Sequence, residues 1–352
     1  MSASTPTAMG STPTAFTPRR VLVTGGCGFI GSNFIRYLLT SDPAVEIVNL
    51  DALTYCGNPE NLRDVETAFG GHRNPGLHDS ASRYIFIRGD IRDPNAVSRA
   101  MADCDCVVHF AAESHVDRSI ACADDFITTN VLGTHRLLEE ARLRGVNRFL
   151  HVSTDEVYGS TLEGSFGEND LLDPSSPYSA SKAAADLLVL SYYTTYGMPV
   201  MITRSTNNFG PYQYPEKLIP LFVTNLMEGR RVPLYGDGGN VRDWIYVLDN
   251  CRALDTVLRQ GEIATVYNVG AGNEVTNRLI TDTILELLGA GEEMVEYVTD
   301  RLGHDRRYSV TTERIQALGW APERDFRQAL ADTVDWYRAN TDWWRPLKDA
   351  VC

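Results

Sequence analysis

Short apolar runs of strand length alternate with longer segments of helical spacing through the first half of the chain. Residues 20–24 (RVLVT) and 45–50 (VEIVNL) predict buried strands, and the apolar positions of residues 34–39 between them recur at helical spacing. Further strands are predicted at residues 84–87, 106–110 and 149–152, with helices over about 125–144 and 178–196. Strands that alternate with helices in this way predict an α/β fold built on a doubly wound parallel sheet.

Residues 25–31 (GGCGFIG) form a glycine-rich turn between the first strand and its helix. Gly25 is expected to turn tightly out of the strand, Gly28 to let a pyrophosphate approach the backbone, and Gly31 to let the helix pack closely on the sheet. Asp51, at the end of the next strand, can accept hydrogen bonds from ribose hydroxyls and would repel a 2′-phosphate. A glycine run alone also occurs in flexible surface turns, but this context predicts a Rossmann-type site that favours NAD over NADP.

Other polar and small residues follow the ends of the predicted strands. Asp90, Ala111, Ala112 and Ser114 occupy such positions, and so does the segment after Val152. Ligands of doubly wound sheets collect at the carboxyl ends of the strands, so these residues are expected near the dinucleotide.

The apolar pattern becomes irregular from Phe209 onward, where aromatic, Gly and Pro residues are frequent. A smaller mixed α/β lobe that closes over the sheet edge is expected there, and 352 residues are enough for two domains. The predicted division is a flexible tail over residues 1–18, an NAD-binding domain with the catalytic residues over 19–208, and a substrate lobe over 209–352 with some segments returning to the first domain. Residues 69–80 predict a lengthened surface loop.

Acidic residues outnumber basic ones, with 46 Asp and Glu against 32 Lys and Arg and a formal net charge of −14. This balance argues against nucleic acid or an anionic membrane as a partner, because both are bound through their phosphates. The 7 cysteines and 7 histidines show no metal-ligand spacing, so no metal site is predicted. Reduced thiols and the lack of a secretory signal or a long apolar stretch predict a cytoplasmic protein without a membrane span.

Tyr178 and Lys182 are a candidate catalytic pair within residues 178–182 (YSASK). They lie four residues apart and therefore share one helix face. An ammonium beside a phenol favours the phenolate, so the pKa of Tyr178 is expected to fall toward neutrality, which would make it a base for a sugar or alcohol hydroxyl. Most isolated pairs with this spacing are ordinary surface helix residues.

Thr154, Asp155 and Glu156 directly follow the strand that contains Val152. Neighbouring carboxylates whose environments separate their pKa values suit the roles of general acid and general base. The same pattern also describes a helix N-cap with an acidic first turn. The combination with Tyr178 and Lys182 favours the catalytic interpretation.

The glycine turn, residues 111–114 (AAES), 153–159 (STDEVYG) and 178–182 (YSASK) together resemble the extended short-chain dehydrogenase/reductase superfamily and, within it, the dTDP-glucose 4,6-dehydratases. The resemblance runs from about Arg20 to Trp336. It implies a lyase of deoxysugar biosynthesis that uses NAD and dTDP-glucose and assembles as a homodimer. The apolar positions of the two long predicted helices are explained equally well by burial against the sheet and by dimerisation.

The resemblance also implies a reaction cycle. Tyr178, assisted by Thr154, would take the proton of the hydroxyl on sugar carbon 4 while hydride passes to NAD. Glu156 would then remove the proton on carbon 5, and protonated Asp155 would donate to the departing hydroxyl on carbon 6. Return of the hydride to carbon 6 would give the 4-keto-6-deoxy sugar. Epimerases of the same superfamily use Tyr and Lys but lack the Asp-Glu pair.

The residues that match the family's ligand positions fall into two sets. The implied cofactor contacts are Gly25, Gly28, Phe29, Ile30, Gly31, Asp51, Leu53, Thr54, Gly57, Asp90, Ile91, Ala111, Ala112, Ser114, Thr129, Ser153, Tyr178, Lys182 and Asn207. The implied substrate contacts are Ser114, Thr154, Asn208, Lys217, Leu218, Pro233, Tyr235, Arg242, Asn277, Arg301, His304, Arg307 and Tyr308. Arg306 is a further candidate for gripping a diphosphate, and Leu302 stands where the family usually has proline.

Two other interpretations remain open. A related enzyme acting on a UDP- or CDP-linked sugar, an epimerase or a decarboxylase would share most of these motifs. A dinucleotide-sensing Rossmann protein without activity would instead have lost residues at the acid, base or Tyr-Lys positions, and no such loss is seen.

Overall fold

Seven parallel strands form the central sheet of the computed structural model, which describes residues 15–70, 82–300 and 304–349. They are β1 (Arg20–Thr24), β2 (Glu46–Asp51), β3 (Tyr84–Arg88), β4 (Cys106–His109), β5 (Arg148–Thr154), β6 (Val200–Ser205) and β10 (Val266–Val269). Their spatial order is β10-β6-β5-β4-β1-β2-β3. The chain order reverses between β1 and β4, which is where such sheets open a crevice for ligands. The predicted α/β doubly wound fold is confirmed.

Helices cover both faces of the sheet. On one face lie α1 (Phe29–Ser41), α9 (Val247–Gln260) and α11 (Glu313–Gln316), and on the other lie α3 (Pro94–Ala100), α6 (Thr134–Arg144) and α7 (Pro177–Tyr196). Side chains alternate along β1, so that Val21 and Val23 join the first core and Leu22 joins the second. Burial of both faces explains why these strands are continuous apolar runs.

The helix expected over residues 125–144 is interrupted. It starts as α5 (Asp124–Phe126), continues as a π-helical segment, η2 (Ile127–Gly133), and becomes α-helical only in α6. Asn130 lies in η2 and is buried, where its amide accepts from the Glu113 N–H and donates to Ser181 Oγ. π-Helical turns are frequent at functional sites, and no hydrophobic periodicity could have signalled this one.

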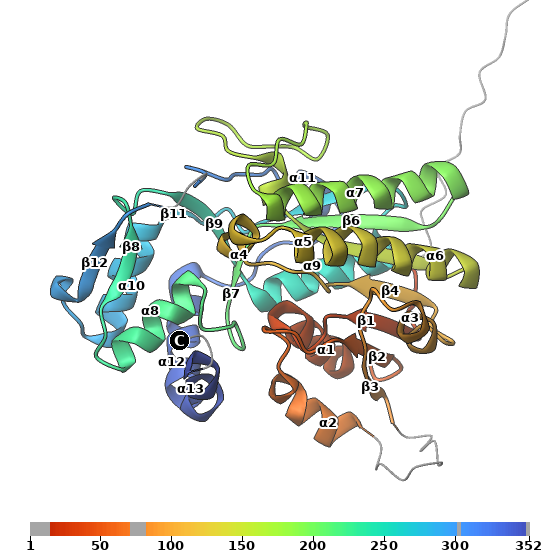
Figure 1. Ribbon diagram of the computed structural model, residues 1–352, viewed down its shortest axis with the longest axis horizontal. Coiled ribbons are helices and arrows are strands. Elements are labelled where there is room, and N and C mark those ends of the chain that lie inside the picture. The colour runs from red at the N-terminus through yellow and green to blue at the C-terminus, as the bar shows by residue number, and fades with distance from the viewer. Residues whose placement is uncertain (1–14, 71–81, 301–303, 350–352) are drawn as a thin grey trace, which may run out of the picture.

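The second lobe packs around its own apolar core, at the left of Figure 1. Its strands are β7 (Asn207–Phe209), β8 (Val232–Tyr235), β9 (Val241–Tyr246), β11 (Glu274–Thr276) and β12 (Val295–Val298), paired as β11-β9-β7 and β12-β8. Its helices are α8 (Leu218–Met227), α10 (Asn277–Leu288), η4 (Glu292–Met294), α12 (Phe326–Ala339) and α13 (Thr341–Asp349). Strand β10 and helix α9 lie between these elements in sequence but belong to the central sheet and its cover.

The remaining described elements are short. They are η1 (Pro59–Leu62), α2 (Arg63–Phe69), α4 (Val116–Ala121) and η3 (Asp155–Tyr158). Within the tail expected over residues 1–18, the Phe16 N–H donates to the Arg259 carbonyl, so contacts with the sheet domain begin before Arg19. Most of that tail and of the expected 69–80 loop lies outside the described residues. Among the helices that are described, none combines the length and apolarity needed to cross a membrane.

The packing of α1 on the sheet generates a stability prediction. Phe34 is fully buried, and its ring centroid lies 5.3 Å from that of Phe110 beyond β4. Phe34→Ala removes this contact and leaves a cavity, so the free energy of unfolding should fall by about 3–5 kcal/mol in chemical denaturation. Leu171→Ala, at a side chain that is 89% exposed, is the control and should change it by less than about 0.5 kcal/mol. Equal losses in both variants would contradict the assigned core.

Candidate active site

The glycine turn between β1 and α1 lies directly against the end of β4. Gly25 has a φ of +70°, and a Cβ there would come within 2.7 Å of the Ala111 backbone. A Cβ on Gly31 would come within 2.5 Å of the Gly25 carbonyl oxygen. No side chain fits at either position, so the close approach of strand, turn and helix requires glycine at both.

Asp51 closes the other side of this turn. Its carboxylate is 7% exposed and accepts the Cys27 N–H at 2.8 Å and the Leu53 N–H at 2.7 Å. Burial raises the pKa of Asp51, and the two backbone donors partly offset that rise. Two bonds leave further lone pairs on the carboxylate oxygens, so Asp51 can also accept from hydroxyl groups of a ligand.

A cavity of about 260 Å³ opens beside the turn and is named here the turn cavity. Of the predicted cofactor contacts, those on its wall are Gly25, Gly28, Phe29, Ile30, Gly31, Asp51, Thr54, Gly57, Asp90, Ile91, Ala111, Ala112, Ser114, Thr129, Ser153, Tyr178 and Lys182. Leu53 and Asn207 are not on this wall, and Asn207 lines a second cavity. The cavity thus gathers residues from five strand ends at the point where the strand order reverses.

Sequence reasoning missed several residues on this wall. They include Cys56, Arg92, Glu113, Gln213, Tyr214 and Glu216. The last three belong to the segment that leads into α8, and the sequence gives no periodic signal that this segment folds back over the sheet. Lys217 of the same segment was predicted as a substrate contact, and its Nζ donates to the Ser114 carbonyl at 3.2 Å. Glu216 and Lys217 line both cavities and therefore mark where the two meet.

The segment after β5 holds the two candidate acid and base residues. Thr154 Oγ1 accepts the Glu156 N–H at 3.3 Å and donates to Asp155 Oδ1 at 3.2 Å. Thr154 therefore caps η3, so the capping interpretation of this motif describes the local structure correctly. The cap also fixes the direction in which the two carboxyl groups leave the backbone, and Glu156 reaches the wall of the second cavity.

Asp155 is 3% exposed, and within the described part of the chain its Oδ2 has no hydrogen-bond partner. Burial, reinforced by the charge of Glu156, raises the pKa of Asp155 to about 8. Arg242 offsets only part of this effect. At neutral pH Asp155 is therefore mainly a protonated acid, able to donate a proton.

Helix α7 carries Tyr178 and Lys182 on the face toward the turn cavity. The helix begins in a capping box in which Ser176 and Ser179 exchange side-chain and backbone hydrogen bonds. Both Tyr178 and Lys182 are buried and line the cavity. Their side chains therefore meet ligands only from inside it.

The expected lowering of the Tyr178 pKa is wrong for this structure. Burial, followed by the charge of Glu156, raises the pKa of Tyr178 well above its ordinary value. The Lys182 ammonium donates instead to the Val152 carbonyl at 2.8 Å, and burial lowers its pKa to about 8. Spacing along a helix predicted the shared face but not the desolvation that dominates at this depth.

A buried polar network lies behind Lys182. Asp186, one turn further along α7, accepts from Arg204 Nε at 2.9 Å, and Arg204 Nη1 donates to Tyr158 Oη at 2.7 Å. His151 Nε2 lies 3.4 Å from Lys182 Nζ and 3.5 Å from Asp186 Oδ1. These charges are shielded from water, so their mutual pairing locks α7 to β5 and β6.

The second cavity, named the lobe cavity, has a volume of about 210 Å³ and lies between the sheet and the second lobe. Of the predicted substrate contacts, Lys217, Leu218, Pro233, Tyr235, Arg242, Asn277, His304 and Tyr308 line it. Arg242 is 5% exposed, its Nη2 donates to the Asp305 carbonyl at 2.8 Å, and its guanidinium lies 4.1 Å from the centre of the Tyr308 ring. The side chain is thus fixed in place before any ligand arrives.

The other predicted substrate contacts lie elsewhere. Ser114 lines the turn cavity, and Thr154 is buried at the N-terminus of η3. The Asn208 Nδ2 donates to the Thr206 carbonyl. Arg307 is held by Glu274 at 2.8 Å, away from both cavity walls, and Arg306 pairs with Asp237 on the surface. Arg301 and Leu302 lie outside the described residues.

The raised pKa of Asp155 generates a prediction of pH-dependent stability. The folded carboxyl keeps a proton that an unfolded Asp, with a pKa near 3.8, has lost. Stability should therefore fall as the pH rises from about 4 to about 8, by up to about 1.4 kcal/mol per pH unit. Asp155→Asn should remove the Asp155 contribution and make the slope shallower when unfolding is measured in denaturant at pH 5, 6, 7 and 8.

The matched control is Asp237→Asn. Asp237 is exposed, and its pairing with Arg306 lowers its pKa to about 2, below this pH range. This control should retain the wild-type slope. Parallel profiles for wild type and Asp155→Asn would show that the Asp155 carboxyl is ionised in the folded protein.

Comparison with known proteins finds relatives that match nearly the whole chain. A family model described as GDP-mannose 4,6 dehydratase matches residues 22–333. The low-salt glycan biosynthesis protein Agl12 of Haloferax volcanii is 53% identical over 318 residues, covering 90% of this chain and 98% of its own. A dTDP-glucose 4,6-dehydratase of Streptomyces antibioticus is 50% identical over 334 residues, covering 93% and 95%. The crystal structure of DesIV, a dTDP-glucose 4,6-dehydratase of Streptomyces venezuelae with NAD and a second ligand bound, matches with a TM-score of 0.88 and 51% identity, covering 93% of this chain and 99% of its own.

Proposed function

The chain belongs to the GDP-mannose 4,6 dehydratase family. We propose that it is an NAD-dependent hydro-lyase that converts dTDP-glucose to dTDP-4-keto-6-deoxyglucose. The proposal rests on the buried Asp155 beside Glu156 at the end of β5, close enough to Tyr178 that both carboxyl groups act on its pKa. An epimerase needs no carboxylic acid to protonate a departing hydroxyl group, because its reaction loses no water. The reaction serves the synthesis of deoxysugars, in the cytoplasm.

The residues of the turn cavity fit NAD. The turn leaves no room for side chains at Gly25 or Gly31, so a pyrophosphate can approach the N-terminus of α1. The Asp51 carboxylate has lone pairs for the two hydroxyls of an adenosine ribose and would repel a 2′-phosphate. When bound, NAD supplies a hydride acceptor that can also return the hydride.

Each chemical step has a residue to move its proton. Tyr178 would accept the proton of the carbon 4 hydroxyl as a carbonyl forms there. Because burial raises its pKa in the unliganded protein, the phenolate would require nearby positive charge, which bound NAD and the Lys182 ammonium on the same helix would supply. The new ketone acidifies the carbon 5 proton, which Glu156 removes. Asp155 donates its proton to the carbon 6 hydroxyl, which leaves as water. The proton on Glu156 returns to carbon 5 when carbon 6 is reduced. Tyr178 is then left protonated and Asp155 ionised, and transfer of one proton from Tyr178 to Asp155 restores both groups, so that atoms and charges balance.

The lobe cavity is suited to the sugar nucleotide. Arg242 and Lys217 are cationic side chains on its wall and would contact the diphosphate. The Asn277 Oδ1 is buried and has no hydrogen-bond partner among the described residues, so it can accept from a ligand donor. Glu216 and Lys217 line both cavities, and the sugar would therefore reach Tyr178 and Lys182 where the two cavities meet.

Substitution of the proposed base separates oxidation from elimination. Glu156→Gln should lower product formation by about 10²–10⁴-fold while bound NAD is still reduced when dTDP-glucose is added. Tyr178→Phe should abolish both signals. The measurements are absorbance of reduced cofactor and mass spectrometry of the sugar nucleotide.

Incubation of the wild-type enzyme with dTDP-, UDP-, CDP- and GDP-hexoses tests the substrate class. Loss of water from the dTDP sugar is expected. If no sugar loses water, or if Glu156→Gln dehydrates at the wild-type rate, the proposed reaction is wrong. Epimerised product without loss of water would identify an epimerase.

We propose further that two copies of the chain pair through α6 and α7. Large apolar side chains on these helices are exposed, among them Leu143, Leu187, Tyr193 and Tyr196. Burial of such side chains is the main favourable contribution in association, and twofold dimers are the commonest oligomers. Leu187→Arg should shift the molar mass from that of a dimer to that of a monomer in light scattering.

The control for this prediction is Leu171→Arg, on the loop before α7. Its side chain is equally apolar and more exposed but lies on neither helix. It should remain dimeric. A dimer that survives Leu187→Arg, or a monomeric wild type, would contradict pairing through α6 and α7.

A further inference from the structure

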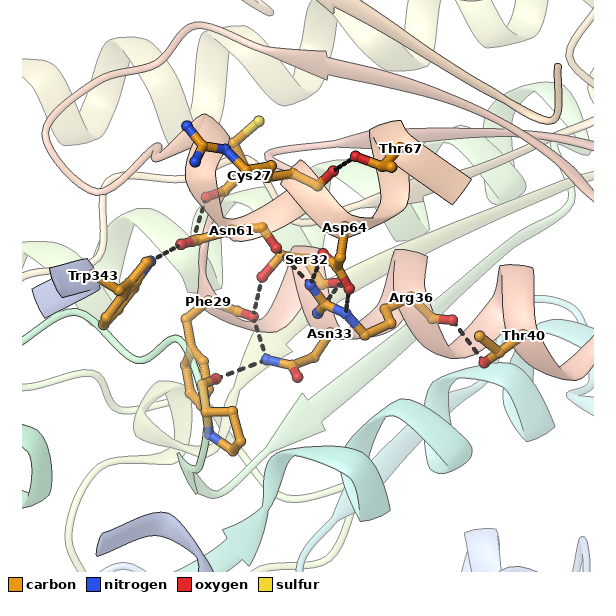
Figure 2. Close-up of polar contacts among 12 residues, drawn as sticks. Cys27, Phe29, Ser32, Asn33, Arg36, Thr40, Asn61, Asp64, Thr67 and Trp343 are labelled. Carbon is orange, nitrogen blue, oxygen red and sulfur yellow. Dashed lines mark hydrogen bonds and ion pairs between the residues drawn. The ribbon is translucent and has the colours of Figure 1, made fainter. Parts of the chain in front are cut away.

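A chain of hydrogen bonds connects the C-terminal helix to the glycine turn (Figure 2). The Trp343 indole N–H on α13 donates to Asn61 Oδ1 at 2.8 Å, and Asn61 Nδ2 donates to the Cys27 carbonyl at 2.9 Å. The Cys27 N–H in turn donates to Asp51 Oδ2 at 2.8 Å. Three hydrogen bonds therefore separate the last described helix from the carboxylate at the turn cavity.

Asn61 can make both contacts in only one orientation. The indole N–H is a donor and needs the amide oxygen, whereas the Cys27 carbonyl is an acceptor and needs the amide nitrogen. Asn61 is 2% exposed, so water does not compete for either group. Trp343 thus fixes the orientation of the Asn61 amide, and that amide holds the Cys27 carbonyl together with the Asn58 N–H, which donates to it at 3.0 Å.

The peptide between Cys27 and Gly28 is consequently held at both ends. Its carbonyl accepts from Asn61, and its N–H donates to the Gly25 carbonyl at 3.1 Å. This peptide immediately precedes α1, and its orientation sets the direction of the N–H groups in the first turn of that helix. Those groups have no partner within the helix and are the ones that face a phosphate.

Trp343 is itself positioned by aromatic neighbours. Its ring centroid lies 5.1 Å from that of Trp336 on α12 and 5.7 Å from that of Tyr212 after β7. A second bond ties the same segment to α1, because Asn33 Nδ2 donates both to the Phe29 carbonyl and to the Pro211 carbonyl (Figure 2). The second lobe therefore contacts the glycine turn through Trp343 and Asn61, and helix α1 through the Pro211 carbonyl.

We propose that Trp343 and Asn61 are positioning residues for the cofactor, through which helix α13 holds the glycine turn in its NAD-binding geometry. The proposal rests on the assignment of NAD to the turn cavity. Its consequence is slow release of NAD from the enzyme. An enzyme that regenerates its cofactor within each turnover gains from such retention, since no exchange is needed between cycles.

The test measures exchange of bound NAD for added NADH in the holoenzyme, followed by NADH fluorescence. Trp343→Phe keeps an aromatic ring against Tyr212 and Trp336 but removes the N–H. Asn61→Asp keeps the acceptor for the indole but removes the donor to Cys27. Each should accelerate exchange by about two- to tenfold, the effect of losing one hydrogen bond. The double variant should be no faster than Asn61→Asp, because both changes break one chain of bonds.

The same helix offers a matched control. Trp344 is fully buried, and its indole N–H donates to the Tyr337 carbonyl at 2.9 Å rather than to Asn61. Trp344→Phe should lower the melting temperature at least as much as Trp343→Phe but exchange NAD at the wild-type rate.

Two outcomes would overturn the proposal. One is a wild-type exchange rate in Trp343→Phe or Asn61→Asp, and the other is equal acceleration in Trp344→Phe, which would indicate a general loss of stability. A wild-type protein that binds no NADH would overturn the proposed function itself, and the inference with it.

Discussion

The close approach of Gly25 to the Ala111 backbone is the constraint on which the site depends. It occurs where the strand order reverses, between β1 and β4, so that the helices leaving these strands diverge to opposite faces and leave a crevice. A side chain at Gly25 would force the strands or the turn apart and misplace every residue that follows. Asp51, the first turn of α1 and the segment from Ala111 to Ser114 all take their positions from this one contact.

Burial then determines the chemistry of the groups that surround the crevice. Burial raises the pKa of both Asp155 and Asp186, but Asp186 accepts a hydrogen bond from Arg204, whereas Asp155 Oδ2 has no hydrogen-bond partner among the described residues. Asp155, after β5, is therefore suited to donate a proton, and Asp186, on α7, anchors that helix to β6 through Arg204. The network of Asp186, Arg204 and His151 also keeps the Lys182 Nζ pointed at the Val152 carbonyl, next to the cavity wall.

The sequence was sufficient for the features that depend on local pattern. Apolar runs predicted the strands β1 to β5, the spacing of Tyr178 and Lys182 predicted their shared face, and the glycine turn predicted the cavity beside it. It was insufficient where distant segments meet. Nothing in the periodicity of residues 213–217 indicates that they cover the turn cavity, and no hydrophobic spacing marks the π-helical segment that contains Asn130. The pKa of Tyr178 was predicted in the wrong direction because desolvation is a property of the folded neighbourhood.

The position of β10 has a consequence for how the chain is made. This strand, from residues 266–269, completes the edge of the central sheet beside β6, and α9 covers the face that includes Leu150 and Met201. A nascent chain that has emerged only as far as residue 208 therefore presents an open strand edge and an uncovered apolar face, both of which invite aggregation. Synthesis must continue by some sixty residues before the sheet can close. During translation the dinucleotide-binding half therefore cannot complete its sheet until β10 has been made, although most of its residues come first in sequence.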